Sequence, residues 1–387
     1  MDSETNIPRR NALGTLIGAG AGLSTSLLSG AQIASATPPA TPPASASVNV
    51  LDFGADPSGL TDSQPSIQQA IDYVVSALSI GTGAVYIPAG VYRIDRPIRM
   101  KGQLRLHGDG YWSVLRCNFG PGAAIPSWNY AGAASPAPAY PPMLYTDRPS
   151  AYMLIEGLQF NGNLKDCYGL WFRECHSSVI RNVWIYKTNK RACSNYYGLQ
   201  FMHDNLQVQY TGDGVACLGC MMFTFISCGW NFVGGPYSLQ WNMPSSGAGG
   251  LNLQTCWFES SSDGSNTVAH LGISGSGVNG RVLLFSNGAG SGTTPQCIHC
   301  FDHNESVTLD GLTSQRWRTS CADLTQIMNG GLPLYLGALT IGVAISGHDI
   351  ILNRPDFTGV IDASGNTGAN ATQQGNRPLA NIITTTD

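Results

Sequence analysis

Basic side chains are gathered in one short stretch of a chain that is otherwise poor in charge. Arg173, Arg181, Lys187, Lys190 and Arg191 fall within nineteen residues. A uronic-acid polymer carries a carboxylate on its sugars, and a cation that neutralises this group makes the adjacent C5 proton easier to remove. If the cluster forms such a site, Arg173, Lys187 and Lys190 belong to the catalytic set and Arg191 is a substrate contact; an ordinary solvated loop is the equal alternative.

Side chains able to move a proton lie close to this basic cluster in sequence. They are the tyrosines at 186, 196 and 197 and the histidines at 176 and 203. Phenol and imidazole are common general bases and acids. We take Tyr186 and His203 as the catalytic candidates, although a lone histidine is more often an ordinary surface or corner residue.

Hydrolysis would need a different set of groups, namely two carboxylates about 5 to 10 Å apart. Asp213, in YTGDGV, and Glu259 are the best candidates, with Asp204 and Asp263 in reserve. Each of them alone also fits a turn, because Asp before Gly is ordinary turn chemistry. Elimination and hydrolysis therefore both stay open.

Tryptophans recur at positions that predict a surface for sugars. In the segments IRNVWI, ISCGWNF and LQTCWF, the alternation of side chains along a strand places Trp184, Trp230 and Trp257 in one outward column. A second set of strands turns Trp171 outward beside Arg173. Such rings stack on the C–H faces of sugars, so these four tryptophans are the predicted substrate contacts. The alternatives are a column covered by a loop or packed in a homotrimer.

These side chains need a repeating scaffold to bring them together. An aliphatic position, a corner residue and alternating apolar residues recur with corners at Gly157, Asn182, Cys228, Thr255, Gly311 and Arg354. Their spacing is one or two coils of a solenoid. Before the repeats, Ile67, Ala70, Ile71 and Val74 recur at helical spacing, which predicts a helix over 64–77 that covers the end of the solenoid.

The segment from residue 48 to residue 110 resembles the opening of the pectate-lyase-like superfamily, with its rhamnogalacturonase/epimerase-like domain. The resemblance lies in Asp52-Phe53-Gly54-Ala55, Thr61-Asp62, the strand IPAGVY and Gly108 with Gly110. It implies an all-β fold, a single-stranded right-handed parallel β-helix with a short N-terminal capping helix. It leaves the reaction open among lyases, hydrolases, epimerases and tailspikes, because a fold does not specify a chemistry.

Two motifs of that superfamily are missing here. The paired Asp-Asp and the Gly-His-Gly of polygalacturonases are not found, which favours elimination over hydrolysis. The acidic cluster and Arg-rich strand motif of calcium-dependent lyases are not evident either, so Ca²⁺ is only a cofactor that the resemblance leaves open. The stretch with Cys297, Cys300 and His303 has ligand-like spacing, but we predict no metal site and expect cysteines to pack inside the solenoid.

The first residues predict export. Arg9-Arg10, an apolar Gly-rich run and Ala34-Ser35-Ala36 resemble a twin-arginine signal over residues 1–36, followed by a Pro/Ala/Ser linker over 37–47 and the β-helix domain over 48–387. The protein would then be periplasmic or secreted, with no membrane contact after removal of the signal. A net charge of −4 argues against binding nucleic acid.

The predicted function is that of an exported enzyme that cleaves an acidic, uronate-containing polysaccharide, by β-elimination before hydrolysis. The open alternatives are a glycoside hydrolase with a carboxylate pair, a uronate epimerase, and a tailspike-like protein that binds glycan without catalysis.

Overall fold

The computed structural model describes residues 47–77, 83–100, 103–123, 138–146, 150–242, 249–260, 269–287 and 296–314, and the strands at 334–339, 349–353, 360–362, 370–374 and 381–383. The predicted signal and the linker up to residue 46 lie outside these residues, as does Asp263. The side chains of Cys297, Cys300 and His303 are likewise not described. No helix among the described residues is long and apolar enough to cross a membrane.

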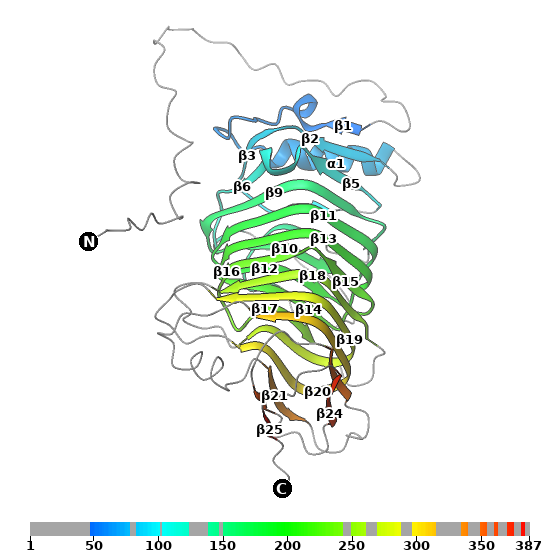
Figure 1. Cartoon of the computed structure of the whole chain (residues 1–387). Helices are drawn as coiled ribbons and strands as arrows, with labels where there is room; N and C mark the ends of the chain where they lie inside the picture. The colour runs from blue at the N-terminus through cyan, green and yellow to red at the C-terminus, as the bar shows by residue number, and fades with distance from the viewer. Residues whose placement is uncertain are drawn as a thin grey trace, which may run out of the picture. The chain divides into compact units, whose positions relative to one another are not determined.

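The described strands form a right-handed parallel β-helix, which confirms the predicted fold class (Figure 1). Each coil contributes strands to two long stacks, and the neighbours in each stack pair in parallel. The first, the β10 stack, contains β4 (Ile98–Met100), β7 (Pro142–Thr146), β10 (Tyr168–Arg173), β12 (Arg191–Tyr196), β14 (Asp213–Leu218), β17 (Tyr237–Asn242) and the first part of β19 (Ala269–Asn287).

The second, the β11 stack, runs along another side of the coils. It contains β1 (Ser47–Asn49), β2 (Ala84–Ile87), β5 (Arg105–Gly108), β9 (Leu154–Lys165), β11 (Cys175–Thr188), β13 (Leu199–Thr211), β15 (Phe223–Ile226), β16 (Gly229–Val233), β18 (Leu251–Ser260) and the rest of β19. The remaining strands are β3 (Gly90–Ile94), β6 (Ser113–Cys117), β8 (Ser150–Ala151), β20 (Gln296–Ser314), β21 (Leu334–Leu339), β22 (Asp349–Asn353), β23 (Val360–Asp362), β24 (Asn370–Gln374) and β25 (Asn381–Ile383).

Single residues with positive φ bend the long strands of the β11 stack at one corner in successive coils. This corner column consists of Gly157, Asn182, Asn205, Ser227, Thr255 and Val282. A left-handed residue turns the chain in one step and lets the strand resume on the next side of the coil. The column fixes which residues beyond the corner point into the core.

The interior is filled by aliphatic and aromatic side chains stacked from coil to coil. Phe201 and Phe225 stack with His203, Phe223 stacks with Phe201, and Trp230 lies 4.6 Å from Phe258, centroid to centroid. The eight cysteines whose side chains are described are all buried free thiols. For these eight, the expectation that cysteine packs as a small core residue is confirmed.

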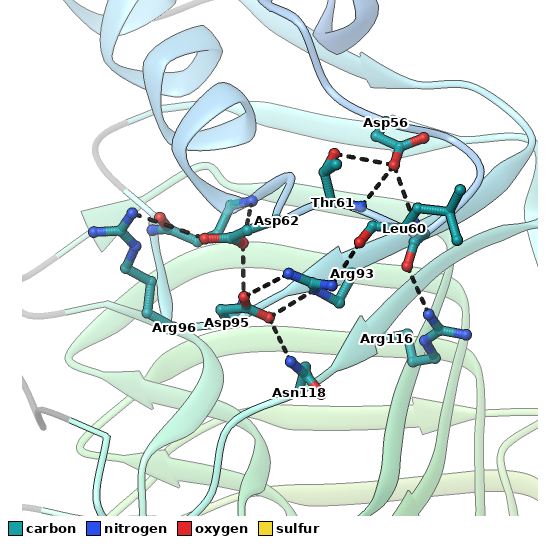
Figure 2. A network of polar contacts seen from close by, with 11 residues as sticks. Asp56, Leu60, Thr61, Asp62, Arg93, Asp95, Arg96, Arg116 and Asn118 are labelled. Carbon is teal, nitrogen blue, oxygen red and sulfur yellow. Dashed lines mark hydrogen bonds and ion pairs between the residues drawn. The ribbon is translucent and has the colours of Figure 1, made fainter. Parts of the chain in front are cut away.

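Helix α1 (Gln64–Ala77) covers the first coil, as predicted, and buries Ile67, Ile71 and Val74. The Asp62 carboxylate accepts from the backbone N–H of Gln64 at 3.0 Å, which caps the helix, and from that of Asp95 at 3.0 Å. Figure 2 shows this network, in which Arg93 also donates to the carbonyl of Leu60 at 2.5 Å. The cap is thus tied to strands of the first coils by hydrogen bonds as well as by apolar contact.

Candidate functional site

Four strands of the β10 stack bring residues from four successive coils into one outward column. Arg191 on β12 pairs with Asp213 on β14. Leu170 on β10 pairs with Cys193 on β12, so Tyr168 and Arg191, each two residues earlier, lie side by side. In the same way, Leu239 on β17 pairs with Val215 on β14, which places Tyr237 beside Asp213. Residues 22 to 24 apart in sequence therefore lie side by side.

An ion pair forms the centre of this column. The Arg191 Nε donates to Oδ2 of Asp213 at 2.7 Å, and the two side chains are 23% and 21% exposed. Burial pulls the pKa of Arg191 down, but the adjacent Asp213 carboxylate more than offsets this, so its pKa is raised. The other Asp213 oxygen accepts from the backbone N–H of Gly214 at 2.8 Å. The cation is therefore fixed in place and permanently charged.

Aromatic side chains form a wall beside the ion pair. Trp171 stacks on Tyr168 at 5.3 Å and packs on Tyr196 at 4.8 Å, between ring centroids. Burial raises the pKa of both Tyr168 and Tyr196, and in each case the charge of Arg191 opposes the rise. Both phenols thus hold their protons at neutral pH.

Lys190 and Tyr140 form the rim of the same surface. The Lys190 Nζ lies 4.4 Å from the centre of the Tyr140 ring and 3.8 Å from the Asp166 carboxylate. Tyr140 in turn contacts Tyr168 edge-on at 5.8 Å. We call the set Tyr140, Tyr168, Trp171, Lys190, Arg191, Tyr196 and Asp213 the Arg191 cluster.

The cluster contains four of the residues predicted from sequence, namely Trp171, Lys190, Arg191 and Asp213. Trp171, however, is only 3% exposed and packs between Tyr168 and Tyr196, so its predicted role as an exposed substrate contact is wrong. Tyr140 and Tyr168 were missed, and Tyr196 was noted only for its position in sequence. Tyr168 could have been found from its spacing, because it precedes Arg191 by 23 residues, about one coil, and Arg191 precedes Asp213 by 22 residues. The corner repeats belong to the other stack and do not align these strands.

The other members of the sequence cluster lie elsewhere. Arg173 is 3% exposed and its Nε lies 3.5 Å from the Glu174 carboxylate, so it is an internal ion pair and not an accessible cation. Tyr186 and Lys187 lie on β11, in the other stack, where the Lys187 Nζ sits 4.9 Å from the Tyr186 ring centre. The prediction of one contiguous basic cluster is therefore wrong, because the chain turns from one stack to the other between Lys187 and Arg191.

The carboxylate pair predicted for hydrolysis is not formed. Asp213 lies on β14 of the β10 stack, whereas Glu259 lies on β18 of the β11 stack, in the column of Tyr186 and Asn231. Neighbouring coils bring only residues of the same stack together. Asp213 and Glu259 consequently cannot flank one sugar, and this prediction is wrong.

His203 and Trp230 are core residues, so their predicted surface roles are also wrong. His203 is fully buried between Phe201 and Phe225, and burial lowers its pKa to about 3. Trp230 is 0% exposed. The corner before it is Ser227 and not Cys228, and a slip of one residue exchanges the two faces of a strand.

Trp184 and Trp257 do lie outward as predicted. Trp184 pairs with Gln207, Gln207 with Gly229, and Gly229 with Trp257, all in one column of the β11 stack. The Trp257 indole covers Gly229, where a Cβ would lie 2.3 Å from the ring. Both tryptophans belong to a surface separate from the Arg191 cluster.

Comparisons with known proteins place the chain in a structural class. Residues 47–125 match the family model described as rhamnogalacturonase A/epimerase, pectate lyase-like. The mannuronan C5-epimerase AlgE1 of Azotobacter vinelandii is 42% identical over 69 residues, which are 16% of this chain and 5% of the epimerase. The matched segment is thus a small part of that relative. The family match covers the cap and the first strands and contains none of the Arg191 cluster.

Solved structures share the fold over most of the chain. The catalytic domain of Agl-KA has a TM-score of 0.54 at 17% identity, covering 84% of this chain and 58% of that one. The surface adhesin PfbA of Streptococcus pneumoniae has a TM-score of 0.50 at 11% identity, covering 85% of this chain and 90% of that one. The resemblance to the pectate-lyase-like superfamily is confirmed: the protein has its right-handed parallel β-helix.

Proposed function

We propose that this protein is a polysaccharide-active β-helix enzyme that removes the C5 proton of a uronic acid at the Arg191 cluster. The observation that carries the proposal is the alignment of Tyr168, Arg191 and Asp213 in one outward column, with Tyr196 beside it. A fixed cation next to two phenols is the set of groups that proton transfer beside a carboxylate requires.

The proposed reaction is β-elimination. Arg191, with Lys190 at the rim, attracts the substrate carboxylate and stabilises the negative charge that develops when C5 loses its proton. One phenol, as phenolate, takes that proton, and the C5–H electrons form a C4–C5 double bond while the C4–O bond breaks. The other phenol protonates the departing oxygen, so protons and electrons balance. Asp213 keeps the guanidinium in position.

Epimerisation is the closest variant of this chemistry. It shares the removal of the C5 proton and differs only in that a proton returns to the opposite face. The family described as rhamnogalacturonase A/epimerase and the matched mannuronan C5-epimerase support C5 chemistry as the proposal. Hydrolysis has less support, since Asp213 and Glu259 lie in different stacks.

The experiment incubates the full chain with polygalacturonate and with alginate, each with and without added Ca²⁺. Ultraviolet absorbance of the conjugated double bond reports elimination, and deuterium exchange at C5 reports epimerisation. We expect Arg191→Ala to reduce turnover by about a hundredfold or more, and Arg281→Ala, a change of an exposed arginine on β19, to leave it intact. Equal activity of wild type and Arg191→Ala would refute the site assignment.

A non-catalytic glycan-binding protein is the second candidate. It is favoured by the ion pair between Arg191 and Asp213, because this carboxylate already neutralises the guanidinium, and the shared fold of an adhesin is compatible with it. If the wild-type protein binds a polymer but produces neither double bonds nor deuterium exchange at C5, this candidate is supported.

Export through a twin-arginine route and assembly as a homotrimer stay proposals from the sequence. Replacing Arg9-Arg10 by Lys-Lys in the natural host should abolish export if the route is right. Sedimentation of the mature chain tests the trimer.

A further inference from the structure

Three aromatic side chains gather where the cap meets the β11 stack. Trp112, in the short helix η2 (Gly110–Trp112), is 71% exposed, and its neighbour Tyr111 is 49% exposed. Tyr111 contacts Trp184 of β11 edge-on at 5.6 Å and Trp112 edge-on at 6.2 Å. We call Tyr111, Trp112 and Trp184 the aromatic platform. A single exposed ring would be ordinary, but three rings in contact form a contiguous aromatic patch, and such patches mark binding sites.

The loop that carries Tyr111 and Trp112 is held rigidly. The Asp109 carboxylate accepts from the hydroxyl of Tyr86 at 2.9 Å and from the backbone N–H of Ala89 at 2.8 Å. The backbone N–H of Asp109 donates to Ser113 Oγ, which donates to the Ile87 carbonyl, both at 2.8 Å. The exposed rings are therefore presented by a fixed support, and a ligand would meet a preorganised surface.

The orientation of the rings leaves faces open. Interplanar angles of 84° and 86° mean that Tyr111 meets its neighbours edge to face. Trp112, with 71% of its surface exposed, keeps most of its indole accessible beside this contact. A sugar stacks on a free ring face, which the highly exposed Trp112 offers.

Amides accompany the platform, and an ion pair lies beside them. Asn205 donates to the Oδ1 of Asn182 at 2.9 Å, and Gln207 donates to Asn205 at 2.8 Å, a ladder that ends at the exposed Asn182 two residues before Trp184. Beside it, Arg181 bonds Asp204 at 3.0 Å. Open ring faces next to amides, with cation and anion engaged with each other, suit a hydroxyl-rich ligand recognised without charge.

We infer that the aromatic platform is a saccharide-binding site, separate from the Arg191 cluster, that holds a polysaccharide chain by stacking and by hydrogen bonds to hydroxyls. It does not depend on the proposed C5 chemistry. Its binding should be insensitive to salt, because no ion pair with the ligand is involved, whereas binding at the Arg191 cluster should weaken as salt rises.

The test is affinity electrophoresis of the full chain in gels containing alginate, polygalacturonate or an uncharged β-glucan. We expect Trp112→Ala to weaken retention by at least one polymer about two- to tenfold, equally at low salt and at about 1 M salt. Trp112→Phe should keep part of the affinity. Leu60→Ala, which removes another exposed apolar side chain of the cap at 76% exposure, is the matched control and should change nothing.

The outcomes separate this site from the proposed active site. Loss of retention in Trp112→Ala with retention in Arg191→Ala supports the platform whether or not the protein is an enzyme. Unchanged retention in Trp112→Ala, or a wild type retained by none of the three polymers, overturns it. A wild-type oligomer that Trp112→Ala converts to monomer also overturns it, since the rings would then pack against a second copy.

Discussion

The pKa values of single side chains decide how the Arg191 cluster can work. The phenols of Tyr168 and Tyr196 have raised pKa values because they are buried, with Arg191 opposing the rise. At neutral pH these phenols are protonated and can act as acids, whereas only a small fraction is present as the phenolate that acts as a base. The base form, and not the acid form, should therefore limit the rate.

The first prediction concerns the pH dependence of turnover. Because the phenolate fraction rises about tenfold per pH unit below the pKa, we expect kcat/KM on a uronate polymer to increase from neutral to alkaline pH. Initial rates measured across this range with polygalacturonate and alginate check it. Tyr168→Phe and Tyr196→Phe should each lower the rate, and a flat profile would show that neither phenol acts as base.

His203 illustrates how burial turns a candidate catalyst into a stability determinant. Its two ring nitrogens have no hydrogen-bond partner among the described residues, and burial lowers its pKa from 6.5 to about 3. The unfolded chain binds a proton that the folded chain excludes. The free energy of unfolding is therefore unaffected by the titration of His203 above about pH 6.5. It decreases as the pH falls towards about 3, by up to about 1.4 kcal/mol per pH unit.

The second prediction is that His203→Phe makes the protein more resistant to acid. A phenyl ring continues the stack of Phe201 and Phe225 and takes up no proton. Acid titration followed by circular dichroism should give a midpoint at lower pH than in the wild type. His270, whose pKa burial also lowers to about 3, should preserve part of the acid sensitivity. An unchanged midpoint would mean that His203 is not what limits acid stability.

The third prediction contrasts two tryptophans that sequence spacing placed together. Trp230→Ala empties a fully buried site and should cost about 3–5 kcal/mol. Trp257→Ala, at a half-buried outward site, should cost less than about 2 kcal/mol. Thermal unfolding of both variants measures the difference, and equal losses would contradict the register described here.

At the scale of the strands, the corner column controls which side chains are core and which are surface. Most of its members are Gly, Asn, Ser or Thr, but the last is Val282, at φ 54° and 59% exposed. A β-branched residue in the left-handed region is strained, whereas Asn adopts that conformation readily, as it does at Asn182 and Asn205.

The fourth prediction is that Val282→Asn stabilises the protein by about 1 kcal/mol, because it relieves the backbone strain and loses only an exposed side chain. Val282→Ala, which removes the β-branch and keeps a Cβ, should gain less. Melting temperatures of the three proteins check the order. A lower melting temperature for the Asn variant would mean that Val282 packs on its surroundings more than its exposure indicates.

For the whole molecule, the cap is the element on which the other coils depend. Helix α1 buries Ile67, Ile71 and Val74 over the first coil, and the network around Asp62 and Asp95 secures it (Figure 2). An uncovered coil would expose apolar side chains and unpaired strand edges.

The fifth prediction is that removing residues 48–80 yields aggregates, as does Ile71→Asp, which buries a charge at a fully buried position. Asp72→Ala, a change on the half-buried side of the same helix, is the control and should leave the protein monodisperse. Size-exclusion chromatography distinguishes the outcomes. A soluble, folded chain without residues 48–80 would show that the cap is dispensable.

The sequence by itself determined the cap, the helix over Gln64–Ala77 and the β-helix, because these follow from local spacing of apolar residues and from a run of matching motifs. It also placed Trp184 and Trp257 outward, since alternation along a strand holds over a few residues once the corner is right. Where the corner was assigned one residue late, at Cys228, Trp230 was assigned to the wrong face.

Only the tertiary structure decided which residues share a site. Lys187 and Arg191 are neighbours in sequence but lie in different stacks, whereas Tyr168, Arg191 and Asp213 are a coil apart in sequence and lie side by side. The physical reason is that a solenoid brings together residues that occupy equivalent positions in successive coils. Which residues are equivalent depends on the length of every turn between them. Turn lengths vary from coil to coil, so proximity in sequence is a poor guide to proximity on the surface.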